Sequence, residues 1–599
     1  MTIAPSDLPT PDLGERLAAV LVRHAHPGAD TALLTATIRR LCTDRSLGHV
    51  CLPLRDRAGT ACDPEDATSA RSTWPAIHPW RAALLTSGLC GDGHDAAVLQ
   101  PMVLDQKDRL YLRRDFVTER TLRHWLRQRM TVPALVTPAA FAAAVRALEP
   151  ERDATTDAID WQLAATAAAA RSPFTLLTGG PGTGKTTTVA RLLGVLTHLQ
   201  PTLRIALAAP TGKAAARLGE ALHQRAAAWP ALAPIAARLQ PTTLHRLLGY
   251  RPGDDSFRAS AQHPLPFDLV IVDEASMVDP VLLAVLCTAL LPQARLLLVG
   301  DRDQLAAVAA GQVLGELCRA AQPERGVGQQ LAAFVQAATG MSLPSPATAS
   351  PLSDHVVALR TNHRFGQQPG IGAFAQALAG RDPAGALAAL RANHADLLHA
   401  ADADHALAEV APQLLAASTA RTAEQALAAL ATVRILTATR HGPLGALAWN
   451  RRVEALLHQR GQRVDSPWYH GRPVLVTQND AQNRLWNGDL GVVVYTPEGR
   501  PMVAFVGSDG GVRLVPPLRL PAHETAWAMT VHKAQGSEYD TILLSMPDRA
   551  GPGWQAPLLY TGISRARRRA VLVAEPSLLA PALAHWPQRS SGLADLDGE

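Results

Sequence analysis

The sequence is poor in cysteine, in aromatic residues and in long apolar runs. Six cysteines in 599 residues are too few for a disulfide scaffold, so we expect a reducing compartment, the cytoplasm. The longest apolar stretch, Pro280 to Val299, is interrupted by Pro292, Gln293 and Arg295, which argues against a membrane span. The N-terminal residues lack the basic-then-apolar order of a signal peptide. A composition of 47% hydrophobic and 18% charged residues is typical of a globular protein rather than a disordered one.

Lysine is also scarce. The chain has 57 lysines and arginines together, but only Lys107, Lys185, Lys213 and Lys533 are lysines. Arginine stands at the other basic positions, which suggests that a retained lysine occupies a place where a compact ammonium is needed and a planar guanidinium does not fit. The formal net charge of +5 mildly favours a polyanionic partner.

The length predicts three or four domains, because a single hydrophobic core stops growing well below 599 residues. Short apolar strands alternate with Ala/Leu-rich helical stretches in two parts of the chain, which is typical of α/β units with a parallel sheet covered on both faces. Residues 340–354, rich in Pro, Ser and Thr, are expected to form a linker or an exposed loop. The expected strands are Phe174–Thr178, Arg204–Ala208, Leu269–Val272 and Leu296–Val299 in the first unit, and Val433–Thr437, Thr541–Ser545 and Ala570–Val573 in the second.

Two regions differ from this alternation. Residues 463–520 contain short strands separated by Asn-Gly and Asp-Gly-Gly turns, which predicts a small antiparallel β-barrel inserted into the second unit. Residues 1–150 mix helical patterns with short strands and are expected to form an α+β domain. The expected domains are therefore 1–150, 151–345, 346–462 together with 521–599, and the insertion 463–520.

Residues Gly179 to Thr186, GGPGTGKT, match a phosphate-binding P-loop between an expected strand and an expected helix. Glycines let backbone N–H groups converge on a phosphate, and the following helix contributes its positive end. Lys185 is expected to reach the β- and γ-phosphates and the Thr186 hydroxyl to bind Mg²⁺, so ATP and Mg²⁺ are the expected cofactors. The predicted nucleotide-binding residues of the loop are Gly179, Gly180, Pro181, Gly182, Thr183, Gly184, Lys185, Thr186 and Thr187.

Acidic and amide side chains follow two of the expected strands. Asp273 is placed to hold the Mg²⁺, and Glu274 to orient and deprotonate the attacking water. Gln304 follows the next strand and is placed to sense the γ-phosphate. A basic cluster near the C-terminus includes Arg565. The cluster is a solvated face, a nucleic-acid patch, or the source of an arginine finger that completes the ATP site from the opposite domain.

Eight motifs follow one another along the chain: GGPGTGKTTT (179–188), APTGKAAARL (209–218), TLHRLLG (243–249), IVDEASMVD (271–279), VGDRDQL (299–305), TNHRF (361–365), TVHKAQGSEYD (530–540) and LYTGISRARRR (559–569). In this order they resemble the superfamily 1 helicases, and more closely the RecD family, the alpha subunits of exodeoxyribonuclease V. The resemblance implies two RecA-like motor domains, an SH3-type fold for the inserted barrel, and ATP-driven 5′→3′ translocation on single-stranded DNA. It also implies work on double-stranded DNA ends in recombinational repair, with RecB-like and RecC-like partners that supply any nuclease activity.

The resemblance assigns roles residue by residue. Gln162 would read the adenine, and Glu538 would lie near the ribose. Gln304, Arg364 and Arg565 would contact the γ-phosphate, and with Lys185, Asp273 and Glu274 they form the expected catalytic set. The residues expected to lie towards the single strand are Thr211, Lys213, His245, Thr530, His532 and Lys533.

Two further patterns are weak signals. Cys42, Cys51, Cys62 and Cys90 lack the close pairs that bind iron–sulfur clusters, so we interpret them as reduced structural cysteines. Asp105-Gln-Lys107 matches the end of a nuclease site in form, but it precedes an expected strand and is interpreted as a polar turn. Five aromatic residues could stack on bases, but each is more readily explained as a core or interface anchor: Phe365, Trp449, Trp486, Trp527 and Tyr539.

Other functions remain open. A standalone RecD-like or conjugative helicase would carry helix–hairpin–helix turns or a relaxase Tyr/His cluster, and residues 1–150 show neither. A non-catalytic scaffold is disfavoured by the intact motifs. The N-terminal region has no catalytic signature. Part of its apolar anchors must form its own core, and the rest are expected to form a face for partner docking: Leu52, Leu54, Trp74, Trp80, Leu110, Tyr111, Leu112 and Trp125.

Overall fold

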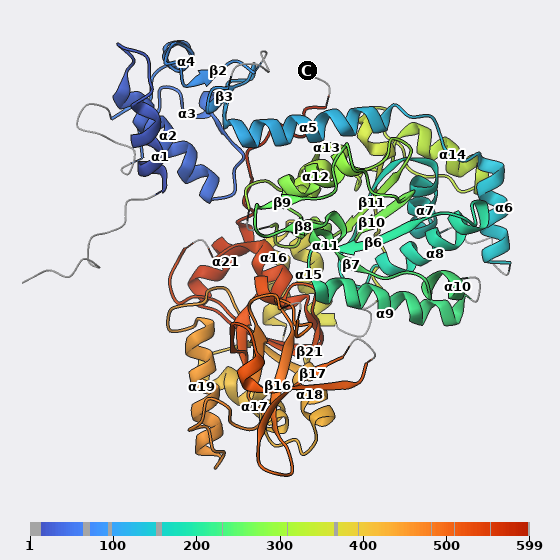
Figure 1. The fold of residues 1–599 in the computed structure, drawn as a ribbon, viewed down its shortest axis with the longest axis vertical. Helices are drawn as coiled ribbons and strands as arrows, with labels where there is room; N and C mark the ends of the chain where they lie inside the picture. Colours follow the sequence, from blue (N-terminus) through green and yellow to red (C-terminus); the bar gives the residue numbers. More distant parts are fainter. Residues whose placement is uncertain are drawn as a thin grey trace, which may run out of the picture.

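The computed structural model describes residues 13–63, 72–93, 99–150, 158–229, 232–307, 309–363, 369–392, 394–480, 482–507, 510–551 and 553–596. Figure 1 shows an N-terminal region in blue, a first α/β unit in cyan and green, and a second unit in orange and red. No helix in these ranges is long and apolar enough to cross a membrane.

The first α/β unit is built on a parallel sheet. Its strands are β5 (Phe174–Thr178), β6 (Ile205–Ala209), β7 (Thr242–Thr243), β10 (Leu269–Val272), β11 (Arg295–Gly300) and β12 (Val356–Ala358). They lie in the order β12-β5-β11-β10-β6-β7, and every pairing is parallel. The register aligns Thr178 with Gly300 and Val272 with Leu298, so β5, β10 and β11 end at one edge of the sheet. Ligands bind at this edge in open α/β sheets.

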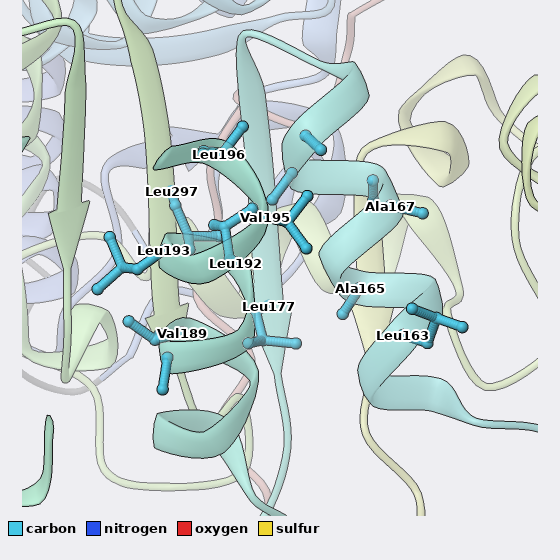
Figure 2. Packing of buried hydrophobic residues seen from close by; sticks show 14 of the residues in the cluster. Leu163, Ala165, Ala167, Leu177, Val189, Leu192, Leu193, Val195, Leu196 and Leu297 are labelled. Carbon is cyan, nitrogen blue, oxygen red and sulfur yellow. The ribbon is translucent and has the colours of Figure 1, made fainter. Parts of the chain in front are cut away.

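Helices cover both faces of this sheet because successive strand residues point to opposite sides. Leu177 and Leu297 pack against one helical layer, and Leu176 and Leu298 against the other. Figure 2 shows Leu177 and Leu297 beneath the apolar face of α8, with the alanine-rich α7 alongside. The first layer holds α6 (Pro138–Leu148), α7 (Trp161–Arg171), α8 (Lys185–Leu199), α9 (Gly212–Ala228) and α14 (Gln329–Thr339); the second holds α5 (Arg113–Met130), α11 (Leu244–Leu248), α12 (Pro280–Ala289) and α13 (Val313–Ala321).

The second unit repeats this plan, so the expected α/β fold with parallel sheets is confirmed. Its strands are β13 (Leu397–Ala400), β14 (Val433–Thr437), β20 (Ala528–Thr530), β21 (Tyr539–Ser545) and β22 (Ala566–Val573). Their order is β13-β22-β21-β14-β20, all parallel. One face is covered by α15 (Pro369–Ala379), α16 (Pro383–Arg391), α20 (Ala556–Ile563) and α21 (Pro576–Ala584), and the other by α17 (Ala403–Ser418), α18 (Ala423–Thr432) and α19 (Ala446–Gln459).

The insertion is an antiparallel sheet with its own small core. Its strands are β15 (Pro473–Val476), β16 (Leu490–Tyr495), β17 (Pro501–Val506), β18 (Val512–Val515) and β19 (His523–Thr525), in the order β18-β17-β16-β15-β19. Val474, Val493 and Phe505 pack together inside it. The antiparallel character was predicted from the turns, and the SH3-type fold stays a prediction.

The N-terminal region combines a small mixed sheet with helices. The elements are α1 (Leu13–Val22), α2 (Thr31–Ser46), β1 (Cys51–Pro53), α3 (Leu54–Arg57), α4 (Ile77–Thr86), β2 (Cys90–Gly91), β3 (Met102–Leu104) and β4 (Arg109–Leu112). The expected docking anchors other than Leu112 are buried, with Trp74 and Trp80 stacked at 4.6 Å. Trp125 of α5 packs in the core of the first α/β unit. The interpretation of these anchors as a docking face is therefore wrong, because their apolar area is already used inside the chain.

Three expected boundaries are corrected by contacts that cross them. Strand β12 pairs with β5, so the chain stays in the first unit past residue 345. Leu352 near the end of the expected linker is fully buried, and Asp354 accepts a hydrogen bond from the Leu331 N–H. Strand β19 pairs with β15, which extends the insertion to Thr525. Helices α5 and α6 cover the first sheet, so that unit begins before residue 151.

The C-terminal tail, residues 589–596, is the fourth correction. It leaves α21 and runs back to the first unit and the N-terminal region (Figure 1). Arg589 Nη1 donates to three carbonyl oxygens between Ala307 and Gly311. Leu593 is 2% exposed among α5 and α12 side chains, and Asp595 pairs with Lys107 at 3.0 Å. The tail therefore does not belong to the second unit, although its residues follow it in sequence.

A half-buried serine holds this tail between two buried glutamates. Ser591 Oγ lies 2.9 Å from Glu119 Oε2 and 2.6 Å from Glu316 Oε2, and the Gly592 N–H donates to Glu119. One hydroxyl carries one proton and can donate to only one carboxylate. Burial raises the pKa of both glutamates, which favours a proton on one of them. The protonated carboxyl can then donate to Ser591, which satisfies both contacts.

We predict that Glu316→Gln removes a pH-dependent loss of stability. A raised folded-state pKa means full stability below the ordinary glutamate pKa of about 4.3 and a loss as pH rises through the folded-state value. The glutamine amide donates to Ser591 at every pH, so at pH 9 the variant should gain about 1 kcal/mol of unfolding free energy over the wild type. Thermal melts at pH 6 and pH 9 measure this. Glu316→Leu, which cannot hydrogen-bond to Ser591, should melt at a lower temperature than the wild type at both pH values. A Glu316→Gln variant that melted like Glu316→Leu would contradict the proposal that a glutamate proton is shared with Ser591.

Candidate active site

The loop after β5 has the backbone geometry of a phosphate cradle. Gly182 and Gly184 have φ angles of +77° and +87°, a left-handed conformation that glycine adopts at no steric cost. At Gly184 an added Cβ atom would also lie 2.2 Å from Gln162 Nε2. The left-handed backbone conformation therefore favours glycine here, as the motif predicted, and the end of the Gln162 side chain would have to move to admit a Cβ atom.

Lys185 begins α8, and its ammonium group folds back over this loop. Nζ donates to the carbonyl oxygens of Gly179 at 2.7 Å and Gly180 at 3.0 Å. These neutral acceptors are weaker partners than the charged oxygens of a phosphate. The ammonium thus stands where a polyphosphate in the loop would meet it. Thr186, the predicted Mg²⁺ ligand, is half-buried in the first turn of the same helix, followed by Thr187.

The acidic pair lies at the end of β10, on the same sheet edge as the P-loop. Asp273 Oδ1 accepts a hydrogen bond from the Glu274 N–H at 2.9 Å. Glu274 has a φ of +50°, a strained conformation of the kind that collects at functional sites. Desolvation and the Glu274 charge raise the pKa of Asp273 to about 6, while Lys185 opposes the shift. The two carboxylates and the P-loop ammonium therefore lie within electrostatic reach of one another.

A buried polar contact joins this edge to the second unit. Gln304 Nε2, after β11, donates to Asp301 Oδ2 at 3.1 Å, and its Oε1 accepts from Arg565. Arg565 lies between α20 and β22 and is 3% exposed. Its Nη1 atom is 4.0 Å from Glu274 Oε1. The predicted catalytic residues Gln304, Arg565 and Glu274 are thus brought together from both units.

Two further segments contact the P-loop. Gln162 Nε2 donates to the Thr183 carbonyl oxygen at 3.3 Å, which places it beside the loop. Sequence reasoning missed Asn362, which donates to the Pro181 carbonyl oxygen at 2.6 Å, and His363, whose backbone N–H donates to Gly182 at 2.9 Å. Their position in the TNHRF motif was the available signal. Arg364 and Phe365 of that motif lie outside the described residues.

Glu538 takes part in a second link between the units. Its carboxylate pairs with Arg217 of α9 and with Arg567 at 3.3 Å. Arg217 Nη1 also lies 3.4 Å from the carbonyl oxygen of Gly536. The structure therefore places Glu538 against the first unit, and its contact with the ribose stays a prediction.

The residues predicted to face DNA follow the strands of both sheets. Thr211 and His245 come shortly after β6 and β7, whose pairing of Ala209 with Thr243 brings them to one edge. Thr211 caps α9 through a hydrogen bond from the Ala214 N–H. Lys213 Nζ lies 5.8 Å from the centre of the Tyr539 ring in the second unit.

In the second unit, Thr530 ends β20, and His532 and Lys533 follow in a short helical turn. Burial lowers the pKa of His532, so the ring is neutral at physiological pH. Lys533 Nζ pairs with Glu524 Oε1 at 2.5 Å, and Arg440 lies 3.3 Å from the same carboxylate. A strand of DNA at this edge would compete with Glu524 for both cations.

Most of the aromatic candidates are core residues. Trp449 and Trp527 are fully buried and Tyr539 is 3% exposed, which confirms their interpretation as anchors. Trp486 is 36% exposed, and its ring lies about 3.9 Å from where a Cβ on Gly212 would stand. It therefore projects from the insertion towards the start of α9.

The two weak sequence patterns have structural explanations. Asp105 Oδ1 accepts hydrogen bonds from the N–H groups of Lys107 and Arg109, so the predicted polar turn is confirmed. None of the cysteines forms a disulfide, and burial raises the pKa of Cys90 to about 12. Among the described residues, no group of three or more His, Cys, Asp and Glu side chains is arranged to hold a metal ion.

Comparison with known proteins agrees with this geometry. Residues 12–111 match the family "RecBCD enzyme subunit RecD, N-terminal domain", residues 162–310 an AAA domain, and residues 525–573 a UvrD-like helicase C-terminal domain. The RecBCD enzyme subunit RecD of Mycobacterium tuberculosis is 42% identical over 70% of this chain and 70% of its own length. That of Mycolicibacterium smegmatis is 38% identical over 91% and 90%. The chain belongs to the RecD family.

As a member of this family, the chain is a helicase with an ATP-hydrolysing P-loop motor. The region beside the P-loop where Arg565 of the second unit meets Gln304 and Glu274 of the first is called the cleft. The ATP-dependent RecD2 DNA helicase of Deinococcus radiodurans is also similar, at 34% identity over 66% of this chain but 46% of that protein. Among solved structures, Bacteroides Pif1 bound to single-stranded DNA is 18% identical over 69% of this chain and 91% of that one, with a TM-score of 0.35.

We predict that Glu274→Gln separates nucleotide binding from turnover. Glutamine keeps the size of the side chain and the backbone strain but cannot accept a proton, so ATP should still bind. The turnover number of the single-strand-stimulated ATPase should fall about 10²–10⁴-fold. Fluorescent-nucleotide binding and phosphate release measure the two quantities. If nucleotide affinity and turnover fell together, Glu274 would instead be part of the binding site.

Proposed function

We propose that this chain is the 5′→3′ DNA-translocating subunit of a RecBCD-type helicase–nuclease that processes double-stranded DNA ends for recombinational repair. The observation that carries the motor assignment is the contact of Arg565 with Gln304 and Glu274 across the cleft. The match of residues 12–111 to the RecD N-terminal family supports the subunit over a standalone helicase. The alternative remains a standalone RecD-like or conjugative 5′→3′ helicase.

ATP with Mg²⁺ fits the residues of the cleft. The Thr186 hydroxyl and the Asp273 carboxylate are hard oxygen donors of the type that Mg²⁺ prefers. Burial and the neighbouring Glu274 charge raise the pKa of Asp273, so a cation at this place would be stabilised by two nearby carboxylates. The ion would neutralise charge on the β- and γ-phosphates. Lys185 would exchange its two loop carbonyls for phosphate oxygens. Gln162 would contact the adenine, and Glu538 the ribose.

The hydrolytic step needs one base and one cation from this chain. Glu274 would take a proton from water as the water oxygen bonds to the γ-phosphorus and the bond to the bridging oxygen breaks, giving ADP and phosphate. Arg565, held at 4.0 Å from Glu274, would balance the charge that develops on the phosphoryl oxygens. Gln304 and Arg364 would contact the same group.

Translocation would follow from movement of one sheet against the other. The units touch through small polar contacts, such as Leu305 N–H to Thr561 Oγ1 at 2.9 Å and Gln535 Nε2 to the Leu305 carbonyl at 3.1 Å. Contacts of this kind can break and re-form when the cleft closes on ATP and opens after hydrolysis. The strand would lie across Thr211, Lys213, His245, Thr530, His532 and Lys533.

Partners would dock on the N-terminal region through residues other than the buried anchors. Leu13 and Val20 of α1 are 71% and 55% exposed and lie seven positions apart, on one side of the helix. Exposed apolar side chains on one side of a helix are a common element of protein interfaces. RecB-like and RecC-like subunits are the proposed partners, and nuclease activity would come from them.

On partial duplexes the chain should unwind substrates with a 5′ single-stranded tail faster than those with a 3′ tail. It should leave the DNA ends uncut. Strand-displacement assays with labelled oligonucleotides measure both, and Lys185→Ala, which lacks the P-loop ammonium, is the inactive control. A preference for 3′ tails would contradict the proposed direction.

A second prediction concerns assembly. The double variant Leu13→Asp/Val20→Asp puts charge on the exposed side of α1 and should weaken co-purification with co-expressed RecB-like and RecC-like chains at least ten-fold. Its single-strand-stimulated ATPase should be unchanged. Leu518→Asp, at a fully exposed leucine on the insertion, is the matched control and should assemble normally. Equal recovery of all three chains would contradict docking through α1.

A further inference from the structure

Tyr560 is a buried residue of the second unit that none of the assigned roles uses. It lies on α20, five positions before Arg565, and is 3% exposed. Its hydroxyl donates to Asp301 Oδ2 in the first unit at 3.0 Å. A Cβ atom added at Gly180 of the P-loop would lie 3.0 Å from the same hydroxyl oxygen. The phenol therefore reaches across the cleft and stands against the phosphate cradle.

Asp301 connects Tyr560 to the predicted catalytic residues through hydrogen bonds. Its Oδ2 atom accepts from both Tyr560 and Gln304 Nε2, and its Oδ1 accepts from the Asp303 N–H at 3.1 Å. Because the Gln304 amide nitrogen donates to the carboxylate, the amide oxygen is directed to Arg565. The orientation of Gln304 thus depends on Asp301 being an ionised acceptor.

We propose that Tyr560 is a positioning residue for ATP hydrolysis, which acts through Asp301 and Gln304 to hold Arg565 beside Glu274. The inference rests on the proposed ATPase role of this cleft. Tyr560 lies on α20 and Arg565 two residues past the end of that helix, so the second unit contributes both ends of the chain of contacts and the first unit its middle. Opening of the cleft would break the Tyr560 and Arg565 contacts together.

The charges around Asp301 explain why a hydroxyl is needed there. Burial raises the pKa of Asp301, and Lys185, Tyr560 and Gln304 oppose the shift. The neighbouring Asp303, itself paired with Arg381 and near Arg302, adds negative charge. The pKa of Tyr560 is raised by burial and by Asp301, so the phenol stays protonated and always donates. Without it, Asp301 would protonate at higher pH, and its proton would compete with Arg565 for the Gln304 amide oxygen.

The test is Tyr560→Phe in the full chain, which keeps the buried ring and removes only the hydroxyl. The turnover number of the single-strand-stimulated ATPase should fall roughly ten-fold at pH 7, with KM for ATP changed by less than about two-fold. The acid limb of its pH profile should move to higher pH. Wild-type turnover with an unshifted pH profile would overturn the proposal.

Tyr469→Phe is the matched control. Tyr469 precedes the strands of the insertion and packs in the core of the second unit, away from the cleft; its hydroxyl donates to the Glu454 carboxylate at 3.0 Å and accepts from Trp527 Nε1 at 2.7 Å. This variant should lose comparable thermal stability but keep wild-type turnover. If both phenylalanine variants lost turnover equally, the effect of Tyr560 would be structural and the proposal would fail.

A double-mutant cycle tests the route through Asp301. Asp301→Ala removes the acceptor to which Tyr560 donates, so adding Tyr560→Phe to it should cost no further turnover. If the two substitutions instead lowered turnover independently, so that the fold-losses of the single variants multiplied in the double variant, the route through Asp301 would be overturned. The Glu274→Gln variant separates this inference from the function: if Glu274→Gln retains turnover, the ATPase assignment fails, whereas if only Tyr560→Phe retains turnover, the positioning role alone fails.

Discussion

Parallel pairing of β5, β11 and β10 places the carboxyl ends of the three strands at one edge of a sheet, and the candidate active site depends on this. The P-loop, the Asp301 loop and the acidic pair each follow one of these strands. The strands are buried on both faces, so their backbone cannot shift without disturbing two helical layers. The catalytic groups are therefore held by packing, while the loops that carry them can accept strained angles such as the φ of +50° at Glu274.

Buried polar side chains, among them Arg565, Asp301 and Gln304, meet where the two units touch beside the P-loop, which makes this contact suited to switching. A buried charge must be paired or hydrogen-bonded, or it costs several kcal/mol. Across the cleft Tyr560 donates to Asp301 and Arg565 donates to Gln304, in addition to contacts that Asp301 and Arg565 make within their own units. The two units thus have a defined closed contact, and a substrate that supplies charged phosphate oxygens can exchange for some of it. In the proposed function, this exchange would couple hydrolysis to movement of the sheets.

The C-terminal tail adds a connection that the motor motifs do not contain. Only a few residues separate the end of α21 in the second unit from Arg589 and Ser590. Arg589 contacts the first unit, and Ser590 contacts the N-terminal region. Ser591 between Glu119 and Glu316 anchors the tail at a buried point where three parts of the molecule meet. An extended chain spans at most about 3.5 Å per residue, so this link limits how far the units can separate.

The sequence by itself determined the inner strands of the two parallel sheets, the P-loop, the acidic pair and the glycine positions, but not the edge strands β7, β12, β13 and β20. It did so because these depend on local periodicity and on backbone angles that few residue types can adopt. It also located Gln304 and Arg565, but not their contact, since 261 residues separate them. Only the tertiary structure decided that β12 and the tail belong with the first unit, that the N-terminal tryptophans are core, and that Tyr560 meets Asp301. Each of these contacts joins segments distant in sequence, and such pairing is set by how the layers pack and leaves no periodic signal in either segment alone.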